Sequence, residues 1–587
     1  MLSLSYMLVS RLLAALLVLP TMITVRALHP LQLQRHATSN CHYLPEDAGW
    51  PSWNQWGSLN QSVGGRLIAG KPLASVCYGH EANAAACTAL QADWTEELIY
   101  FTDPIAVMSP KFLNDSCTPF IATATASNSS ACALGNLPNY AINVSSAEDL
   151  VAGFKFAKDN NIRLVVKNTG HDFLGRSSGQ GSLSLWTHNL KDITFLNYTS
   201  EGYKGPAVRL GAGVQAYEAY AAVASKDLRI TGGLCPTVGL AGGYITGGGH
   251  GPLMGSYGLA ADNSLEFEVV TPDKGYLVAS PSKNADLFWA LNGGGGSAYA
   301  VILSHTTRAH ADGPVAGATV SINNTDETTY WAAVDAWHSL LPALNSVPGA
   351  ASSFEITEAS FFALITVLDG STTEVTDTLA PFLAQLDQLN VSYASVITYD
   401  PTYYAHFSES VSNLPYGPFP TNNLVGGRII PLSVVSTEDQ RSKLIAALRT
   451  ILGSNTTSWG ISGNAANLSV SHTGLDTARL PAWSKMAYTL QINAFPDRDA
   501  SVDLLNNANA EIIAGQDVLR SLTPGGGTYI NEATADPAYW KDDFYGINYQ
   551  RLLAVKETYD SGVILYGPGV VRSDYWTVAS DGRLCKV

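Results

Sequence analysis

The sequence predicts an α+β fold built from two domains, and three observations support this prediction. The chain has 587 residues, which is longer than a single hydrophobic core usually supports. Short β-branched runs, such as the IRLVV segment at 162–166, alternate with amphipathic helical segments. Near residue 314 glycine becomes less frequent, and longer helices then alternate with strands up to about residue 535, as in an antiparallel sheet covered by helices.

Composition and charge narrow the classes of partner. Apolar residues make up 46% of the chain, charged residues only 14%, and the formal net charge is −16. The isoelectric point is about 5.1. Such a chain has no basic stripe that could neutralise nucleic-acid phosphates, and it is also poorly suited to an anionic membrane surface. We therefore expect a small-molecule substrate and no nucleic acid.

The N-terminus indicates export. Arg11 precedes an apolar run from Leu12 to Val25 that Pro20 interrupts, so residues 1–27 are typical of a signal peptide, with a signal anchor as the alternative. No later run is long and apolar enough to span a bilayer, so no membrane association is expected once the signal is removed. Nine Asn-x-Ser/Thr sequons favour a glycosylated protein that is secreted or held in the secretory-pathway lumen. They begin at Asn60, Asn114, Asn128, Asn143, Asn197, Asn323, Asn390, Asn455 and Asn467.

Residues 28–133 form an expected N-terminal extension that contains five of the seven cysteines. In an oxidising compartment six cysteines could pair. Short-range pairs Cys77–Cys87 and Cys117–Cys132 would leave Cys41 for Cys585, although spacing alone leaves other connectivities open. Cys235 is then the odd cysteine, in a glycine-rich loop far from the others.

Secondary-structure signals sharpen after residue 144. A capping-box serine at Ser145 or Ser146 opens a helix, and IRLVV, SLSLWT at 182–187 and AVRLGAGV at 207–214 are typical of strands. Residues 215–227 predict an Ala-rich helix, and 264–278 predict a hairpin with a Pro-Asp-Lys-Gly turn. In the second domain, 360–368 and 487–495 predict strands and 437–453 a helix. An amphipathic helix is expected after Asn548 and Tyr549.

Four glycine loops are candidates for ligand binding, because bare backbone amides can cradle a diphosphate. They lie around Gly170, at 232–243, at 247–251 and at 293–296. None matches a P-loop or a Gly-x-Gly-x-x-Gly fingerprint, so neither a P-loop nor a Rossmann site is supported. The simpler alternative is a set of turns in a glycine-rich β protein. His171 and Cys235 favour a site, since each places a nucleophile inside a glycine loop; alternatively, His171 is a solvated side chain and Cys235 a small buried apolar one.

Three ordered motifs carry a family resemblance. The segments KNTGHDFLGRSSG, GGLCPTVGLAGGYITGGGHGPLMGSYGLAADN and NADLFWALNGGGG, with FYGINYQRLLAVKETYD near the C-terminus, resemble the vanillyl-alcohol-oxidase superfamily. The berberine-bridge-enzyme-like branch, in its secreted fungal type, is the closer match. The resemblance implies a PCMH-type FAD-binding domain at 134–313, a substrate domain of antiparallel sheet plus helices at 314–535, and a segment at 536–587 that returns to the FAD domain.

The resemblance also implies positions for FAD. His171 and Cys235 fall where this branch attaches an imidazole and a thiolate to the flavin, and both are suitable nucleophiles. Asp262 is expected to support the adenosine side. The other implied cofactor-binding residues are Asn168, Thr169, Gly170, Asp172, Phe173, Gly239, Gly242, Gly243, Gly247, Gly248, Gly249, Asn548 and Tyr549. No metal site is predicted, and the oligomeric state is left open.

The implied reaction is a two-electron oxidation of an alcohol, an amine or a secondary metabolite, with hydride transfer to the flavin and reoxidation by oxygen. A base must reach the substrate proton, so Tyr529, Glu532 and Asn493 are the catalytic candidates. Gln491 is a further substrate-facing candidate on the same strand, and His250 could face the site or act as a spacer. Strands also carry outward polar residues without any function. The alternatives are a carbohydrate oxidase, a catalytically silent secreted flavoprotein, or a disulfide-stapled binding module.

Overall fold

The structure is a computed structural model that describes residues 40–79, 82–112, 116–120, 132–412, 414–415, 423–454, 456–469, 473–534 and 538–587. The expected signal peptide at 1–27 lies outside the described residues, as do the sequon residues Asn114, Asn128 and Asn455. Within the described ranges, none of the helices combines the length and the apolar character that a bilayer crossing requires.

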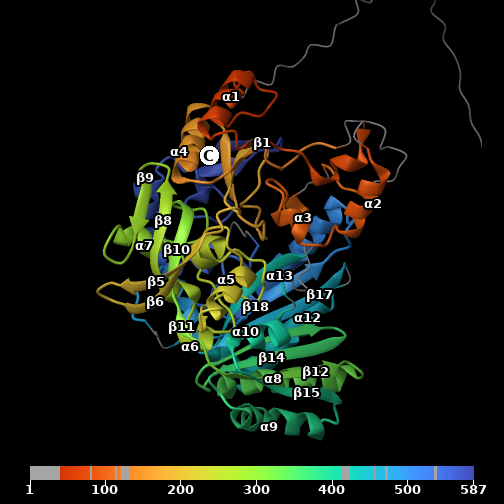
Figure 1. The fold of residues 1–587 in the computed structure, drawn as a ribbon. Helices are drawn as coiled ribbons and strands as arrows, with labels where there is room; N and C mark the ends of the chain where they lie inside the picture. Colours follow the sequence, from red (N-terminus) through yellow and green to blue (C-terminus); the bar gives the residue numbers. More distant parts are fainter. Residues whose placement is uncertain are drawn as a thin grey trace, which may run out of the picture.

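A small, mainly parallel sheet carries the loop of His171. It contains, in order, β1 (Leu67–Ala69), β2 (Tyr140–Asn143), β4 (Ser182–Trp186) and β3 (Arg163–Lys167). The β2–β4 and β4–β3 pairs are parallel, and the helix α4 (Ala147–Asp159) connects β2 to β3. The first strand of the sheet, β1, is labelled in Figure 1 close to helix α4. Leu150 and Phe154 of α4 pack with Leu185 in one buried cluster. The predicted helix and strand are both confirmed, because their apolar spacing matches the face that each one buries.

A five-stranded antiparallel sheet packs beside the first. Its order is β5 (Ile193–Thr199), β6 (Lys204–Gly211), β10 (Val301–Arg308), β8 (Ser264–Thr271) and β9 (Gly275–Ala279). The β8–β9 hairpin turns at the predicted Pro-Asp-Lys-Gly segment. The helix α5 (Ala216–Ala224) follows β6, and α7 (Ala285–Leu291) precedes the 293–296 glycine loop and β10. The glycine loops therefore connect strands and helices that are themselves packed into the hydrophobic cores.

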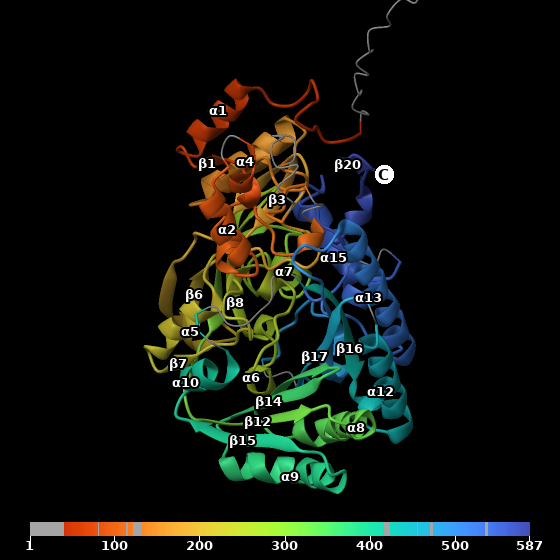
Figure 2. The ribbon, with the colours of Figure 1, turned by 90° about the vertical axis from the view of Figure 1, so that its right-hand side faces the viewer.

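The second large unit is a seven-stranded antiparallel sheet. Its order is β15 (Tyr393–Asp400), β12 (Val315–Asn323), β14 (Ser360–Leu368), β13 (Ala350–Thr357), β17 (Ser458–Ala466), β18 (Met486–Phe495) and β16 (Leu424–Pro431). Four helices lie along one face of it, as Figure 2 shows: α8 (Glu327–Leu344), α9 (Thr372–Gln388), α12 (Glu438–Leu452) and α13 (Val502–Leu522). Trp337 of α8 is fully buried in the core between helices and sheet. The α+β fold class is confirmed.

The remaining elements are short, apart from one C-terminal helix. The helix α15 (Tyr549–Tyr559) confirms the prediction of a helix after Asn548. The other helices and turns are α1 (Trp53–Ser62), η1 (Leu73–Cys77), α2 (Ala84–Ala92), α3 (Leu98–Phe101), η3 (Pro110–Phe112), η5 (Leu240–Tyr244), α6 (Met254–Tyr257), η6 (Ala260–Asn263), α10 (Tyr403–His406), η7 (Phe407–Val411), α11 (Leu432–Val435), η8 (Pro481–Lys485), α14 (Trp540–Phe544), η9 (Gly546–Asn548) and η10 (Ser573–Tyr575). The short strands are β7 (Leu228–Arg229), β11 (His310–Ala311), β19 (Trp576–Val578) and β20 (Leu584–Lys586).

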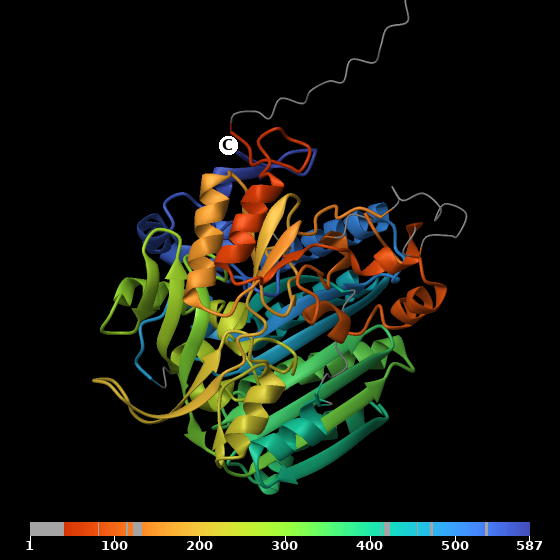
Figure 3. The same ribbon diagram turned by 45° about the horizontal axis from the view of Figure 1, so that its top comes forward.

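Three disulfides join the N-terminal extension to itself and to the C-terminus. Cys77 pairs with Cys87 and Cys117 with Cys132, and Cys41 pairs with Cys585. The first described residues and the C-terminus therefore lie together, as Figure 3 shows. Cys235 is a free cysteine. The Cys41–Cys585 disulfide thus ties the start of the extension to the C-terminal segment, and the other two disulfides lie within the extension.

Candidate functional site

Two loops bring the two predicted nucleophiles together. His171 lies in the loop after β3, and Cys235 lies in the loop that follows β7. Their Nε2 and Sγ atoms are 3.9 Å apart, and both residues are partly exposed. Gly170, with φ +94°, adopts a backbone conformation that side chains disfavour, so glycine is required there to turn the chain toward His171. The structure thus groups two residues that are far apart in the sequence.

Two buried residues, Thr237 and Glu97, complete a cluster with His171 and Cys235. Thr237 Oγ1 lies 2.7 Å from His171 Nε2 and 3.3 Å from Cys235 Sγ, and the hydroxyl donates a 2.6 Å hydrogen bond to Glu97 Oε2. The second carboxylate oxygen of Glu97 lies 3.8 Å from Cys235 Sγ. Sequence reasoning missed both residues. Thr237 follows Cys235 by two positions, but nothing in the weakly periodic segment around Glu97 distinguishes it.

Burial controls the charges of this cluster. Desolvation raises the pKa of Glu97 to about 7, against opposing hydrogen bonds from Thr237 and Cys235. Burial, followed by the charge of Lys167, lowers the pKa of His171 to about 4. Burial and the nearby Glu97 raise the pKa of the Cys235 thiol. At neutral pH the imidazole is therefore uncharged and the thiol protonated. Side-chain atoms of Glu97, His171 and Cys235 lie within 4.8 Å of one another, so a change of charge on one of these groups acts directly on the other two.

A cavity of about 220 Å³, here called the glycine-loop cavity, lies between the loops. Its lining includes predicted residues from two glycine loops together with residues near the C-terminus. These are Asn168, Thr169, Gly170, His171, Asp172, Phe173, Gly239, Gly242, Gly243, Tyr529 and Glu532. Gly295, Gly296 and Arg176 also line it. Three of the four glycine loops thus open onto one space.

The glycines on this lining serve two different purposes. A Cβ at Gly239 would lie 2.7 Å from the Asn168 side chain, and one at Gly242 would lie 2.8 Å from it. Asn168 must come this close because its Nδ2 donates to the Ala212 carbonyl at 2.5 Å. A Cβ at Gly243 would meet no protein atom within 4 Å. Gly243 therefore leaves open space beside the cavity that the fold itself does not need.

Three buried polar atoms on the lining lack partners among the described residues: Oδ1 of Asn168, Nη2 of Arg176 and Oε2 of Glu532. The Arg176 guanidinium is otherwise held by the carbonyls of Pro568 and Ile530, at 3.0 and 3.2 Å. A buried cation with a spare N–H, beside exposed backbone amides, suits an anionic ligand such as a diphosphate. Sequence reasoning missed Arg176, although it lies in the same glycine-rich segment as His171.

A second cavity of about 240 Å³, here called the sheet-side cavity, lies between these loops and the seven-stranded sheet. It shares His171, Asp172, Phe173, Val238, Tyr244, Tyr529 and Glu532 with the glycine-loop cavity. Polar side chains of the sheet and its edge line the far side, namely Ser353, Asn423, Ser462, Asn464 and Gln491. Asn493 is not on the lining; its Nδ2 donates to Ser462 Oγ at 2.8 Å, one layer behind it.

The predicted catalytic pair lies where the two cavities meet. Glu532 Oε1 is 2.7 Å from His250 Nε2, and Glu532 Oε2 is buried without a partner among the described residues. The Tyr529 hydroxyl accepts a 2.9 Å hydrogen bond from Asn531 Nδ2. Burial and the neighbouring Glu532 raise the pKa of Tyr529 well above its usual range, so this hydroxyl keeps its proton. His250 lines the sheet-side cavity, which places it in the site.

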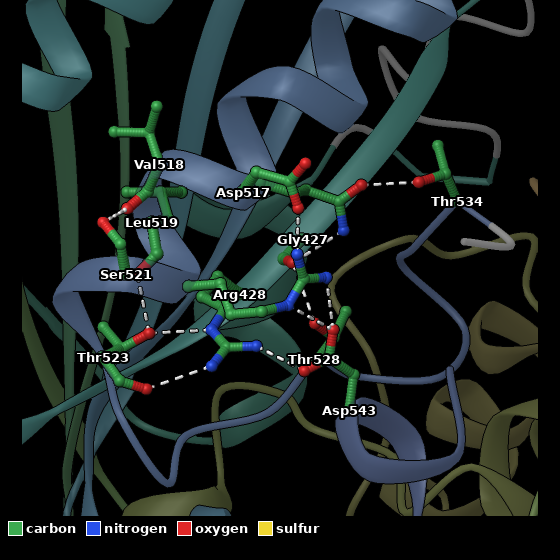
Figure 4. Close-up of polar contacts among 12 residues, drawn as sticks. Gly427, Arg428, Asp517, Val518, Leu519, Ser521, Thr523, Thr528, Thr534 and Asp543 are labelled. Carbon is green, nitrogen blue, oxygen red and sulfur yellow. Dashed lines mark hydrogen bonds and ion pairs between the residues drawn. The ribbon is translucent and has the colours of Figure 1, made fainter. Parts of the chain in front are cut away.

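A buried ion-pair network anchors the loop that carries Tyr529 and Glu532 (Figure 4). Arg428 Nη1 of β16 lies 2.6 Å from Asp543 Oδ1, and its other nitrogens donate to Thr523. Thr528, just before Tyr529, donates its hydroxyl to the Gly427 carbonyl at 3.0 Å and its N–H to the Asp543 carbonyl at 2.8 Å. The loop is therefore held to both the sheet and the C-terminal segment.

Several predicted positions lie off both cavities. Gly247, Gly248 and Gly249 stand behind the lining: a Cβ at Gly247 would meet Asn531 at 2.3 Å, and Gly248 and Gly249 have φ of +115° and +73°. Asn548 donates to the carbonyls of Ala478 and Arg479, both at 3.1 Å, and Tyr549 packs against Trp540. Asp262 pairs with Arg479 at 3.1 Å. In the described structure these residues contact other parts of the protein and hold neighbouring segments together.

Comparisons with known proteins agree with this geometry. The FAD binding domain family matches residues 138–279, and the berberine and berberine-like family matches residues 528–563. The VAO-type flavoprotein oxidase VAO615 of Thermothelomyces thermophilus is 40% identical over 566 residues, which is 95% of this chain and 97% of that protein. The bifunctional decalin synthase calF of Penicillium decumbens is 38% identical over 584 residues, covering 97% and 99% of the two chains.

Solved structures show the same fold. The VAO-type flavoprotein MtVAO615 from Myceliophthora thermophila C1 superposes with a TM-score of 0.88 at 40% identity, covering 93% of this chain and all of that one. A carbohydrate oxidase from Microdochium nivale superposes with a TM-score of 0.64 at 17% identity, over 88% of this chain and all of that one, and this likeness shows the fold alone.

Proposed function

The chain belongs to the FAD-linked, VAO-type flavoprotein oxidoreductases with a berberine-like C-terminal segment, and we propose that it oxidises an alcohol or amine bound in the sheet-side cavity. The enzyme class and the cofactor, FAD, are those predicted from the sequence. The observation that carries the proposal is Glu532: a buried carboxylate with one unpartnered oxygen, at the junction of the two cavities.

The residues of the glycine-loop cavity fit FAD. Gly243 leaves room that no protein atom fills, and the spare N–H of Arg176 and spare oxygen of Asn168 offer a donor and an acceptor to a polar ligand. We place the diphosphate against the backbone of 168–173 and the flavin between His171 and Cys235, both as covalent attachment points. When bound there, FAD supplies the two-electron acceptor, and oxygen is the expected final oxidant.

The protein contributes the proton chemistry. Glu532 takes the proton from the substrate hydroxyl or amine, and His250, 2.7 Å from its other oxygen, holds the carboxylate in place. Tyr529 keeps its proton because burial and Glu532 raise its pKa, so its hydroxyl donates a hydrogen bond to the substrate heteroatom. A hydroxyl or amine substrate places a donor against the spare Glu532 oxygen, which would otherwise remain buried and unsatisfied.

The lining of the sheet-side cavity disfavours an anionic substrate. Among the described residues it includes Glu97, Asp172 and Glu532 but no lysine or arginine, so an anionic substrate would find no counter-charge. The amides and hydroxyls of Asn423, Asn464, Gln491, Ser353 and Ser462 could hold several hydroxyl groups. This lining supports a carbohydrate oxidase as the second candidate.

A two-stage experiment tests the proposal. Acid precipitation of the purified protein should give a yellow pellet, since tethered flavin stays with the denatured chain. His171→Ala or Cys235→Ala alone should leave one tether, and only the double variant should release flavin. A panel of alcohols, amines and sugars with a peroxide readout then identifies the substrate. A colourless protein would contradict FAD binding, and a yellow protein without peroxide for any substrate class would contradict the oxidase activity.

We also propose that the protein is exported. Three disulfides require an oxidising compartment, and the sequon residues Asn197, Asn323, Asn390 and Asn467 are exposed, where glycans could be carried. Loss of mass on treatment of the secreted protein with an N-glycosidase would support this, and retention of the unprocessed leader inside the cell would contradict it.

A further inference from the structure

The N-terminal extension supplies one side chain to the site, and it is held there by buried contacts. Glu97 immediately precedes α3 and is only 5% exposed. The Lys167 ammonium, at the end of β3, donates to the carbonyls of Tyr100 and Asp103 at 2.9 and 2.5 Å. Because the loop of His171 begins directly after Lys167, the same residue fixes both the Glu97 segment and the start of the histidine loop.

The hydrogen bonds between Glu97, Thr237 and His171 have a direction. An ionised carboxylate only accepts hydrogen bonds, so the single hydroxyl proton of Thr237 points to Glu97 Oε2, 2.6 Å away. The Thr237 oxygen can then only accept from His171 Nε2 at 2.7 Å, which requires that Nε2 carries a proton. The neutral imidazole has one ring proton, so the lone pair is left on Nδ1. This chain of hydrogen bonds therefore selects the tautomer of His171 that carries its proton on Nε2.

We propose that Glu97 and Thr237 act as a proton relay that makes Nδ1 of His171 the nucleophile for attachment to FAD. The inference rests on the covalent attachment proposed above and adds the residues that drive it. Bond formation at Nδ1 leaves a cationic ring, which loses its Nε2 proton through the Thr237 hydroxyl to Glu97. One hydrogen leaves the imidazole and one leaves the flavin methyl group, and the electron pair reduces one molecule of oxygen to hydrogen peroxide.

Protonation of Glu97 should switch the relay off. A neutral carboxyl can donate to Thr237, whose hydroxyl can then donate to Nε2 and shift the ring proton to Nδ1. Burial raises the pKa of Glu97 to about 7, whereas His171, with a pKa lowered to about 4, stays neutral throughout. The ionisable groups around Glu97 and His171 are Glu96, Cys235 and Lys167, and the Cys235 thiol stays protonated because its pKa is raised. Burial lowers the pKa of Lys167 to about 7, so any pH dependence that Lys167 causes should persist in Glu97→Gln. Attachment at His171 should therefore slow by about tenfold at one pH unit below 7.

Attachment of flavin at His171 and attachment at Cys235 can be measured separately, because the two residues fall on different tryptic peptides. Trypsin should release residues 168–176 with His171 and residues 230–274 with Cys235, because Lys167, Arg176, Arg229 and Lys274 bound them. Thr237→Val removes the relay to His171 and the 3.3 Å contact of the hydroxyl with Cys235 Sγ, but it leaves Glu97 beside the Cys235 sulfur. It should lose flavin mass on 168–176 and keep it on 230–274. Thr237→Ser retains the hydroxyl and is the matched control.

The test uses full-length protein produced under riboflavin limitation and then incubated with FAD and oxygen at about pH 6 and pH 8. Wild type and Thr237→Ser should attach flavin at His171 about tenfold faster at the higher pH. Thr237→Val and Glu97→Gln should be at least about tenfold slower at pH 8, with little dependence on pH. Glu97→Gln serves as the test if Thr237→Val does not fold. Wild-type rates in either variant would overturn the relay. Wild-type protein without flavin on either peptide would instead refute covalent attachment itself.

Discussion

Glu532 Oε1 lies 2.7 Å from Nε2 of His250, and this contact joins the loop at 527–534 to the 247–251 glycine loop. Both side chains line the sheet-side cavity. One oxygen of Glu532 is held while the other remains unpartnered among the described residues. This arrangement fixes the carboxylate and leaves a lone pair for a substrate donor.

Glu532→Gln should lower kcat by about 100-fold or more, because a neutral amide cannot take a proton. Flavin content should be unchanged, since Glu532 is not an attachment point. Stopped-flow reduction of the bound flavin by the substrate found in the panel measures the effect. Glu358→Gln, an exposed change in the sheet unit, is the control. Wild-type reduction in Glu532→Gln would remove Glu532 from the chemistry.

Gly243→Ala should lower the flavin-to-protein ratio without destabilising the fold. A Cβ there meets no protein atom within 4 Å, so only a ligand can clash with it. Absorbance ratios and thermal unfolding of the full chain measure the two effects. Gly57→Ala, equally unobstructed but inside α1, should leave the flavin content unchanged and raise the thermal midpoint, since alanine is favoured over glycine by about 0.5–1 kcal/mol in a helix interior. Equal flavin content in Gly243→Ala and wild type would contradict the placement of FAD.

Arg428→Met should destabilise the protein by about 3 kcal/mol, because it removes one partner of a buried ion pair. Arg428 and Asp543 are almost completely buried, and within the described part of the chain the variant leaves Asp543 with Arg520 as its one cationic partner. The same network holds the Thr528 end of the loop at 527–534, which carries Tyr529 and Glu532, so kcat should fall as well. Arg551→Met breaks an exposed pair with Asp476 and should have little effect on the thermal midpoint. Similar midpoints for the two variants would contradict the anchoring role.

Glu97→Gln should become more stable relative to wild type as pH rises. The folded state of wild type keeps the Glu97 proton up to a pKa of about 7, above the ordinary 4.5. Between these values the folded state binds more protons than the unfolded state, so the free energy of unfolding falls as pH increases, by at most about 3 kcal/mol. Glutamine has no such dependence. Thermal midpoints of the flavin-free proteins at about pH 5 and pH 8 measure it, and a constant difference between the two proteins would be the contrary result.

The sequence indicated the parts of the site that depend on local chemistry. Glycine loops, two nucleophiles and the Tyr529–Glu532 segment are each readable from a few adjacent residues, and the FAD-linked family follows from their order along the chain. The short-range disulfides Cys77–Cys87 and Cys117–Cys132 were also among the expected pairs. The predicted catalytic role of Asn493 requires a contact with the substrate, but the Asn493 side chain lies behind Ser462 and is not on the lining of the sheet-side cavity.

The sequence by itself therefore determined the fold class and, through its ordered motifs, the FAD-linked family, because periodicity and short motifs are properties of neighbouring residues. The roles of His171 and Cys235 as attachment points stay predictions. Only the tertiary structure decided which side chains meet. It brought Glu97 to Thr237 across the chain, placed Gly247 to Gly249 behind the lining, and turned Asn548 toward the carbonyls of Ala478 and Arg479. These contacts join segments that are far apart in the sequence. They depend on how the sheets and helices pack against one another, which no local sequence pattern specifies.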